Sequence, residues 1–125
     1  MKTIDKDKKI VEEKVIDASG KSLGRLATAV ASVLSGKDKA TYERHIYCGA
    51  PVKVVNASKM RVSVERLEGI THKRYSGFPG GLRLMSGVEV SEKNGFKELV
   101  KHAVFKMLPG NKLRREMMKN LKIED

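Results

Sequence analysis

Residues 14–36 read KVIDASGKSLGRLATAVASVLSG and predict a strand, a turn and a helix in one short run. Lys14–Ala18 is rich in β-branched residues, which favour strands. Residues 19–21 supply turn chemistry, and Ser22 is placed to cap a helix N-terminus. Apolar residues then recur at helical spacing and form one stripe, which Gly36 ends. The stripe consists of Leu23, Leu26, Ala27, Val30, Ala31 and Leu34.

Further strand candidates follow in the middle of the chain. Residues 51–55 are mostly apolar and β-branched, which predicts a strand in the interior of a sheet. Residues 60–64 are expected to be another extended piece, and residues 70–75 a third strand after a turn at 68–69. Residues 76–81 contain three glycines and a proline, so they must form a loop.

Two more amphipathic helices are predicted near the C-terminus. One covers about residues 96–108 and ends at Pro109-Gly110, and the last covers about residues 111–121. Strands that alternate with helices in this way point to an α/β sandwich with a small, largely parallel sheet.

The charge balance points to a negatively charged partner. The chain has 125 residues, which suits a single domain over residues 14–125 after a charged, flexible extension over residues 1–13. There are 26 Lys and Arg against 15 Asp and Glu, a net charge of +11. Nucleic acid is the commonest partner for such an excess. A solvated basic surface without a partner is the plainer alternative.

The excess positive charge lies within the folded part of the chain. Residues 1–17 carry five basic and five acidic groups, so they add no net charge. Residues 69–87 contain no Asp or Glu, and residues 106–122 hold six basic residues against Glu116 alone. Surfaces that meet phosphates need such acid-poor stretches, because a carboxylate would repel the backbone it approaches.

Several classes of protein are excluded or disfavoured. The sequence has no apolar run long enough for a membrane span, and its start lacks the pattern of a signal or transit peptide. A single cysteine, Cys48, forms no internal disulfide, which indicates a reducing, cytoplasmic location. His45 and Cys48 have a ligand-like spacing, but no second pair completes a zinc site. We therefore expect no metal, no cofactor and no catalytic group.

The turn Gly20-Lys21-Ser22 lies between a strand and a helix and suggests a phosphate-binding loop. The full nucleotide-binding motif needs a glycine five residues before Gly20, where Val15 stands. A milder interpretation is that Lys21 and Arg25 hold one RNA phosphate at the helix N-terminus. Ordinary helix capping without a ligand is the alternative.

The glycine-rich loop 76–81 is the most informative feature. His72, Lys73 and Arg74 precede it and Arg83 follows it, so cations flank a backbone that can approach a ligand closely. Tyr75 or Phe78 could stack on a splayed base. The alternative is a tight connection between sheet and helix with scattered surface charge.

An ordered set of motifs makes the chain resemble the universal large-subunit ribosomal protein thirteen family in its bacterial-type form. The motifs run in the family's order over about residues 14–123. They are VIDASGKSLGRLA (15–27), Gly36-Lys37 with Tyr42 and His45, VVNA (54–57), YSGFPGG (75–81), and VFKMLP (104–109) with Leu113-Arg114-Arg115 and Leu121-Lys122.

The resemblance implies a three-layer α/β/α sandwich on a four-stranded parallel sheet. It also implies a non-catalytic protein that binds large-subunit ribosomal RNA, joins early in assembly and contacts neighbouring ribosomal proteins. No membrane and no small-molecule substrate are expected.

The resemblance also implies three groups of RNA-binding residues, carried over by position. The first is Lys37, Lys39, Arg44 and His45. The second is Lys73, Arg74, Tyr75, Phe78, Gly80, Gly81 and Arg83. The third is Lys106, Arg114 and Arg115, to which the basic last helix adds Lys119.

Two other functions compete with the ribosomal role. One is a nucleotide-dependent enzyme that uses the Gly20-Lys21-Ser22 turn, which ATP binding would reveal. The other is a regulatory RNA binder that acts away from the ribosome through the same surface, which the sequence does not distinguish from a ribosomal protein.

Overall fold

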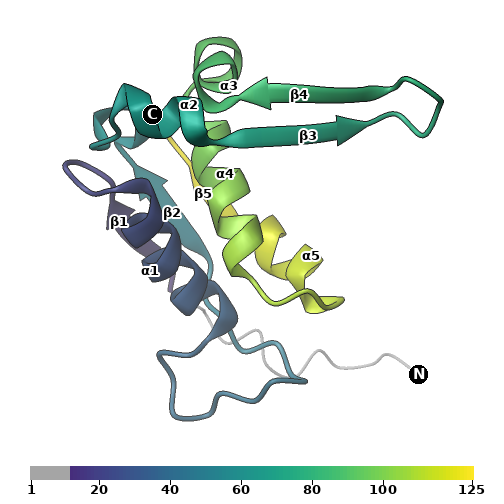
Figure 1. The fold of residues 1–125 in the computed structure, drawn as a ribbon. Helices are drawn as coiled ribbons and strands as arrows, with labels where there is room; N and C mark the ends of the chain where they lie inside the picture. The colour runs from purple at the N-terminus through teal and green to yellow at the C-terminus, as the bar shows by residue number, and fades with distance from the viewer. Residues whose placement is uncertain (1–11) are drawn as a thin grey trace.

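The computed structural model of the chain describes residues 12–125 (Figure 1). Most of the extension expected over residues 1–13 lies outside the described residues. The described chain is of mixed α/β type, as predicted, with a small parallel sheet, several helices and a separate β-hairpin.

The parallel sheet has three strands. They are β1 (Lys14–Asp17), β2 (Val52–Val55) and β5 (Leu121–Ile123), in the order β1-β2-β5. The prediction that β2 is an interior strand is therefore confirmed. Ile16 pairs with Val54, and Val54 with Ile123, so one row of apolar side chains crosses all three strands.

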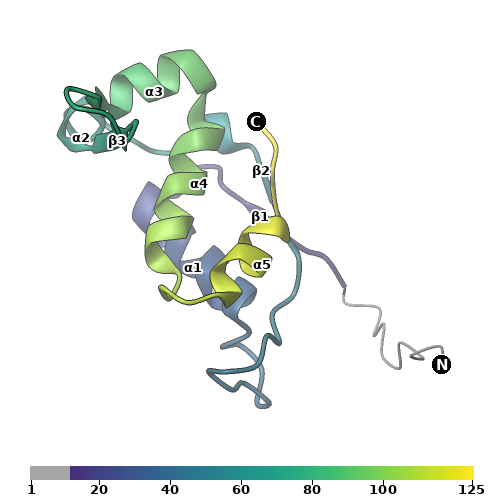
Figure 2. The same ribbon diagram turned by 90° about the vertical axis from the view of Figure 1, so that its right-hand side faces the viewer.

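Three helices pack on one side of this sheet (Figure 2). They are α1 (Leu23–Ser35), α4 (Phe96–Met107) and α5 (Leu113–Lys119). The predicted stripe of α1 is buried, and it meets Val100 and Val104 of α4 in a single core with Val52 and Val54 of β2. This agreement follows from the 3.6-residue period, which puts the six residues of the stripe on one face of α1.

The end of α1 shows why Gly36 stops the helix. Its φ is +80°, the left-handed region that glycine enters without steric cost. A Cβ at this position would lie 2.7 Å from the Cys48 sulfur and 2.9 Å from the Cys48 carbonyl carbon. Gly36 therefore both ends the helix and lets the following loop pass close by.

The opposite side of the sheet is not covered by a helix among the described residues. Val15, Lys53 and Lys122 form one row across that face, and Val15 is 63% exposed. Two lysines of this face form ion pairs. Lys53 of β2 pairs with Glu124 at 2.9 Å, and Lys122 of β5 pairs with Glu13 at 3.3 Å. The described chain therefore forms two layers here, where the family resemblance implies three.

The hairpin is the second departure from expectation. Residues 71–75 do form a strand, β3 (Thr71–Tyr75), but it pairs antiparallel with β4 (Leu82–Ser86) and not with the parallel sheet. Six residues connect the two strands, whereas a parallel crossover needs a dozen or more. The parallel sheet thus has three described strands, and the four-stranded sheet is not found.

Two short helices flank the hairpin at its base. They are α2 (Val64–Gly69) and α3 (Gly87–Asn94). The extended piece expected at residues 60–64 is irregular up to Ser63, whose hydroxyl accepts a hydrogen bond from the Arg66 amide at 3.4 Å and caps α2. A 3₁₀ turn, η1 (Ala57–Lys59), precedes this segment.

The C-terminal helix is shorter than predicted. Helix α5 ends at Lys119, and Leu121 belongs to β5 instead of the last helical turn. Backbone pairing with β2 outweighs the helical spacing of Leu121, because the Val52 amide donates to the Asn120 carbonyl at 2.9 Å. No helix within residues 12–125 is long and apolar enough to cross a membrane.

The core predicts a sharp contrast between two leucines. Leu99 is 1% exposed and Leu84 is 58% exposed. Leu99→Ala should lower the free energy of unfolding by about 2–5 kcal/mol, because it leaves a cavity in the core. Leu84→Ala should change it by less than about 0.5 kcal/mol. Urea titrations with equal m-values measure both changes, and equal losses would contradict this core.

Candidate nucleic-acid interface

A basic cleft lies where the turn after β1 meets the segment before α2. It has a volume of about 700 Å³. Its walls carry four cationic side chains and two hydroxyls, and no acidic residue lines it. These side chains are Lys21, Arg25, Arg61, Arg66, Ser22 and Ser63.

Backbone hydrogen bonds hold the two walls of this cleft together. The Gly20 amide donates to the Lys59 carbonyl at 3.1 Å, and the Arg61 amide donates to the Lys21 carbonyl at 3.0 Å. Gly20 has a φ of +69°, so the turn suits glycine. The predicted pair Lys21 and Arg25 is thereby placed opposite two arginines from another part of the chain.

The hairpin extends away from the rest of the fold (Figure 1). Arg74 and Arg83 are directly opposite each other in its register, so they project from the same face. Like charges in this position repel, and no ion pair within the described residues compensates them. An anion bound between them would remove the repulsion.

The alternate residues of the hairpin expose apolar side chains. Tyr75 is opposite Leu82, and Leu84 lies two residues further along the same face. Their exposed fractions are 64%, 58% and 58%, and Phe78 in the loop is 72% exposed. The hairpin therefore offers aromatic rings for stacking beside its cationic residues.

The loop at the tip of the hairpin requires its glycines. Gly80 has a φ of +74°, and a Cβ on Gly81 would lie 1.9 Å from the Ser76 hydroxyl oxygen. The Gly81 amide donates to the Phe78 carbonyl at 3.0 Å, which closes the turn. These glycines shape the tip and leave its backbone uncovered by side chains.

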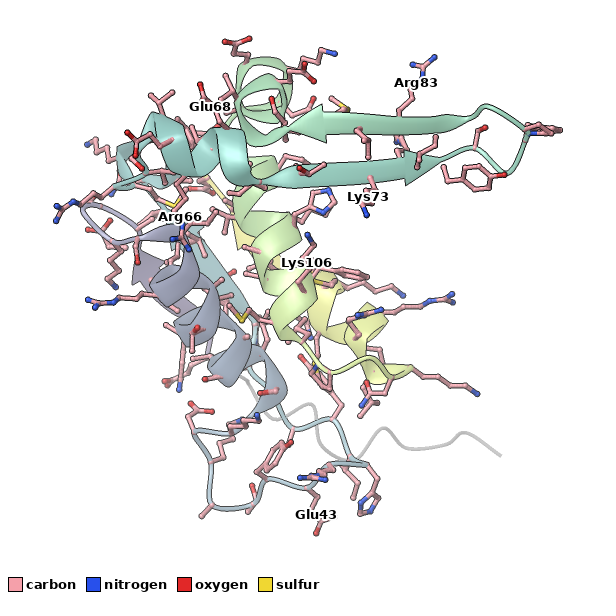
Figure 3. All side chains as sticks on the ribbon, viewed as in Figure 1. Glu43, Arg66, Glu68, Lys73, Arg83 and Lys106 are labelled. Carbon is pink, nitrogen blue, oxygen red and sulfur yellow. The ribbon has the colours of Figure 1, made fainter. Side chains whose placement is uncertain are left out.

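Two histidines join the hairpin to α4. The rings of His72 and His102 are 4.4 Å apart in an edge-to-face arrangement, and both ring nitrogens of His72 are buried without a hydrogen-bond partner. Burial lowers the pKa of His72, and the nearby His102 and Lys106 lower it further, while Glu98 opposes the shift. Figure 3 shows Lys73 and Lys106 in the angle between the hairpin and α4.

A second basic hollow, of about 840 Å³, lies around α5. The Arg114 guanidinium carbon is 3.9 Å from the centre of the Phe105 ring, a cation–π contact that connects α5 with α4. Glu116 is the one acidic residue that lines this hollow. The predicted residues Arg115 and Lys119 line the same hollow.

The loop between α1 and β2 holds the remaining predicted residues. Lys37, Arg44 and His45 are exposed, and His45 lies 3.4 Å from the Glu43 carboxylate. The Lys39 ammonium donates to the Cys48 carbonyl at 2.9 Å, so it also holds this loop together. This group is less uniformly basic than the cleft or the hairpin.

Comparison with known proteins matches the sequence of the chain to one family. The family model described as "Ribosomal protein L13" matches residues 12–123. The chain belongs to this family.

Relatives named "Large ribosomal subunit protein uL13" agree with the family assignment. The chain is 43% identical to that of Syntrophotalea carbinolica over 87% of this chain and 76% of the relative. It is 44% identical to that of Thermotoga maritima, over 87% of this chain and 72% of the relative. It is 46% identical to that of Nitratiruptor sp., over 87% and 77% respectively.

Sequence reasoning did not single out Arg61 and Arg66 in this member of the L13 family. Arg61 lies within the stretch 60–64, which the sequence predicts only as an extended piece, and Arg66 lies just after it; no local motif marks either residue. Their position in the cleft depends on the pairing of residues 20–21 with residues 59–61, which are distant in sequence. The only local signal is Ser63, a residue type that favours helix N-caps.

The His72 environment predicts a pH dependence of stability. The folded-state pKa of His72 lies below its unfolded value, so the unfolded chain binds more protons in that range. Stability should therefore fall as the pH drops through about 6.5 towards the folded pKa. His72→Phe keeps the packing and should flatten this part of the pH profile of melting temperature. An unchanged slope in the variant would contradict the assignment.

Proposed function

We propose that the chain is a structural constituent of the large ribosomal subunit, which binds large-subunit ribosomal RNA and supports early assembly without catalysis. The observation that carries the proposal is the family match over residues 12–123, together with relatives named as large-subunit proteins. We place it on cytoplasmic ribosomes, with neighbouring large-subunit proteins as further partners.

Unpaired positive charge supports this proposal. Among residues 12–125, the ion pairs of lysine involve only Lys14, Lys53 and Lys122, and no arginine is ion-paired. Every lysine and arginine assigned to the proposed interface is thus left without a carboxylate partner in the described part of the chain. When such side chains neutralise RNA phosphates, the counterions condensed on the RNA are released at a net gain in entropy.

The residues divide into positioning and stacking roles. In this proposal Lys21 and Arg25, together with the lysines and arginines of the hairpin and α5, contact phosphates, which fixes the orientation of the domain over residues 14–125. Tyr75 and Phe78 stack on unpaired bases, and Gly80 and Gly81 let the backbone approach the RNA. The exposed leucines Leu82 and Leu84 suit an apolar neighbour, such as another ribosomal protein.

The electrostatic mechanism predicts a steep salt dependence. The logarithm of the association constant for a large-subunit rRNA transcript should fall linearly with the logarithm of salt concentration, by about 0.7–0.9 for each neutralised phosphate. Filter binding or fluorescence anisotropy between low and moderate salt gives the slope. Binding that does not change over this range would overturn the mechanism.

The hairpin supplies a direct mutational test. Arg74→Ala with Arg83→Ala should weaken rRNA binding about tenfold or more, because a hydrogen bond to a charged group contributes about 1.5–3 kcal/mol. The salt slope should also decrease by about 1.4–1.8, because two phosphate contacts are lost. Far-UV circular dichroism should be unchanged, since both residues are exposed.

A matched control removes two charges elsewhere. Lys93 and Lys97 are exposed and belong to none of the proposed contact groups. Lys93→Ala with Lys97→Ala should leave the salt slope nearly unchanged. Equal losses in the two double variants would mean that net charge alone, and not the hairpin, determines binding.

A further inference from the structure

We propose that the cleft between α1 and α2 is a second, separate binding site for the RNA phosphate backbone, with Arg61 and Arg66 as its previously unassigned contacts. This inference rests on the proposed function, and it adds an RNA contact at a place away from the hairpin. Figure 3 shows Arg66 beside α1, at the end of the molecule opposite the tip of the hairpin.

The convergence of four cations is the first argument. Lys21 lies in the turn after β1 and Arg25 in α1. On the other wall of the cleft, Arg61 precedes α2 and Arg66 lies within it. None of the four is ion-paired within the described residues. Holding them around one cleft of about 700 Å³ costs repulsion energy, which a bound anion with several charges would offset.

Asp17, whose charge interacts with Lys21, is already engaged in hydrogen bonds. Asp17 accepts hydrogen bonds from the Ser19 amide at 3.0 Å and from the Asn56 side chain at 3.1 Å. These bonds, more than the charge of Lys21, hold the pKa of Asp17 below its usual value. The carboxylate therefore stabilises the turn and leaves the cationic side chains available to a ligand.

Neutral donors in the cleft add to this charge. The Ser22 side chain makes no capping hydrogen bond, so the first amides of the thirteen-residue helix α1 receive no partner from it. The Ser63 oxygen accepts from the Arg66 amide, which leaves its own hydroxyl proton to donate. A phosphate in the cleft could thus receive bonds from guanidinium, ammonium, hydroxyl and backbone groups.

The walls of the cleft are fixed before a ligand arrives. The backbone bonds Gly20–Lys59 and Arg61–Lys21 connect its two sides independently of any side chain. The binding groups are therefore partly oriented in advance, which lowers the entropy lost on association. Flexible surface lysines without such a framework would lose more.

The composition of the cleft favours a backbone over a free nucleotide. Its lining contains no aromatic side chain on which a base could stack. The cleft therefore has the groups that bind linked phosphates. RNA and a free nucleotide both supply such phosphates, and the experiments below distinguish between them.

The first test removes the two newly assigned arginines. Arg61→Ala with Arg66→Ala should weaken binding of the full chain to a bacterial large-subunit rRNA transcript about tenfold, and it should reduce the salt slope by about 1.4–1.8. The Lys93→Ala with Lys97→Ala variant is the control for loss of charge and should change affinity less than about threefold. Wild-type affinity and slope in the arginine variant would overturn the site.

A second test leaves all four cations in place. A Cβ added to Gly24 would meet only the Arg66 guanidinium, at 3.9 Å. Gly24→Glu puts a carboxylate beside Arg66 in the first turn of α1, where an acidic residue is favourable for the helix. It should lower rRNA affinity while the melting temperature stays equal or rises.

The neutral variant at the same position is the matched control. Gly24→Ala should raise the melting temperature and keep rRNA affinity, since alanine favours helix and adds no charge. Equal affinity of the Glu and Ala variants would overturn the site, whatever their stability.

The outcomes separate this site from the proposed function. If the wild-type chain binds rRNA and the cleft variants bind equally well, the site is wrong and the function stands. If the wild-type chain binds an unrelated RNA of equal length more tightly than rRNA, the proposed function is wrong, whatever the cleft variants do. Saturable ATP binding that Arg61→Ala with Arg66→Ala abolishes, without any change in rRNA affinity, would instead assign the cleft to a nucleotide.

Discussion

The packing of α1 and α4 against one face of the parallel sheet is the interaction on which the rest of the structure depends. Val30 and Leu34 of α1, Val100 and Val104 of α4 and Val54 of β2 are inaccessible to solvent. Because the three short strands carry a continuous apolar row on this side only, the helices gather there and the other face keeps Lys53 and Lys122. The packing of the core thus determines which surfaces are left for cationic side chains.

The hairpin and the cleft use this core in different ways. The hairpin leaves the core and is attached at its base, where Gly87 donates to the Ile70 carbonyl at 2.8 Å and His72 meets His102. A two-stranded hairpin is marginal by itself in water, so this attachment is what orders Arg74 and Arg83. The cleft instead lies beside α1, and backbone hydrogen bonds between residues 20–21 and residues 59–61 hold its two walls together.

The sequence predicted the parts of the fold that local periodicity determines. The stripe of α1, the stop at Gly36 and the interior strand β2 all follow from spacing within a few residues. Strand β5 was not predicted, because three residues are too few to show a period. The pairing of β3 with β4 was not predicted either, because antiparallel pairing depends on contacts between residues on the two sides of a loop. Arg61 and Arg66 were missed for the same reason, since only a long-range backbone pairing brings them to Lys21.

The distribution of charge now has a structural cause. A net charge of +11 on one small domain destabilises the compact state, because the cations repel one another. Here they are separated onto the hairpin, the cleft and α5, with the core between them. When two RNA-binding groups belong to one domain, binding at the first raises the effective concentration of RNA at the second. Separation of the cations into these groups therefore strengthens attachment to an extended RNA surface.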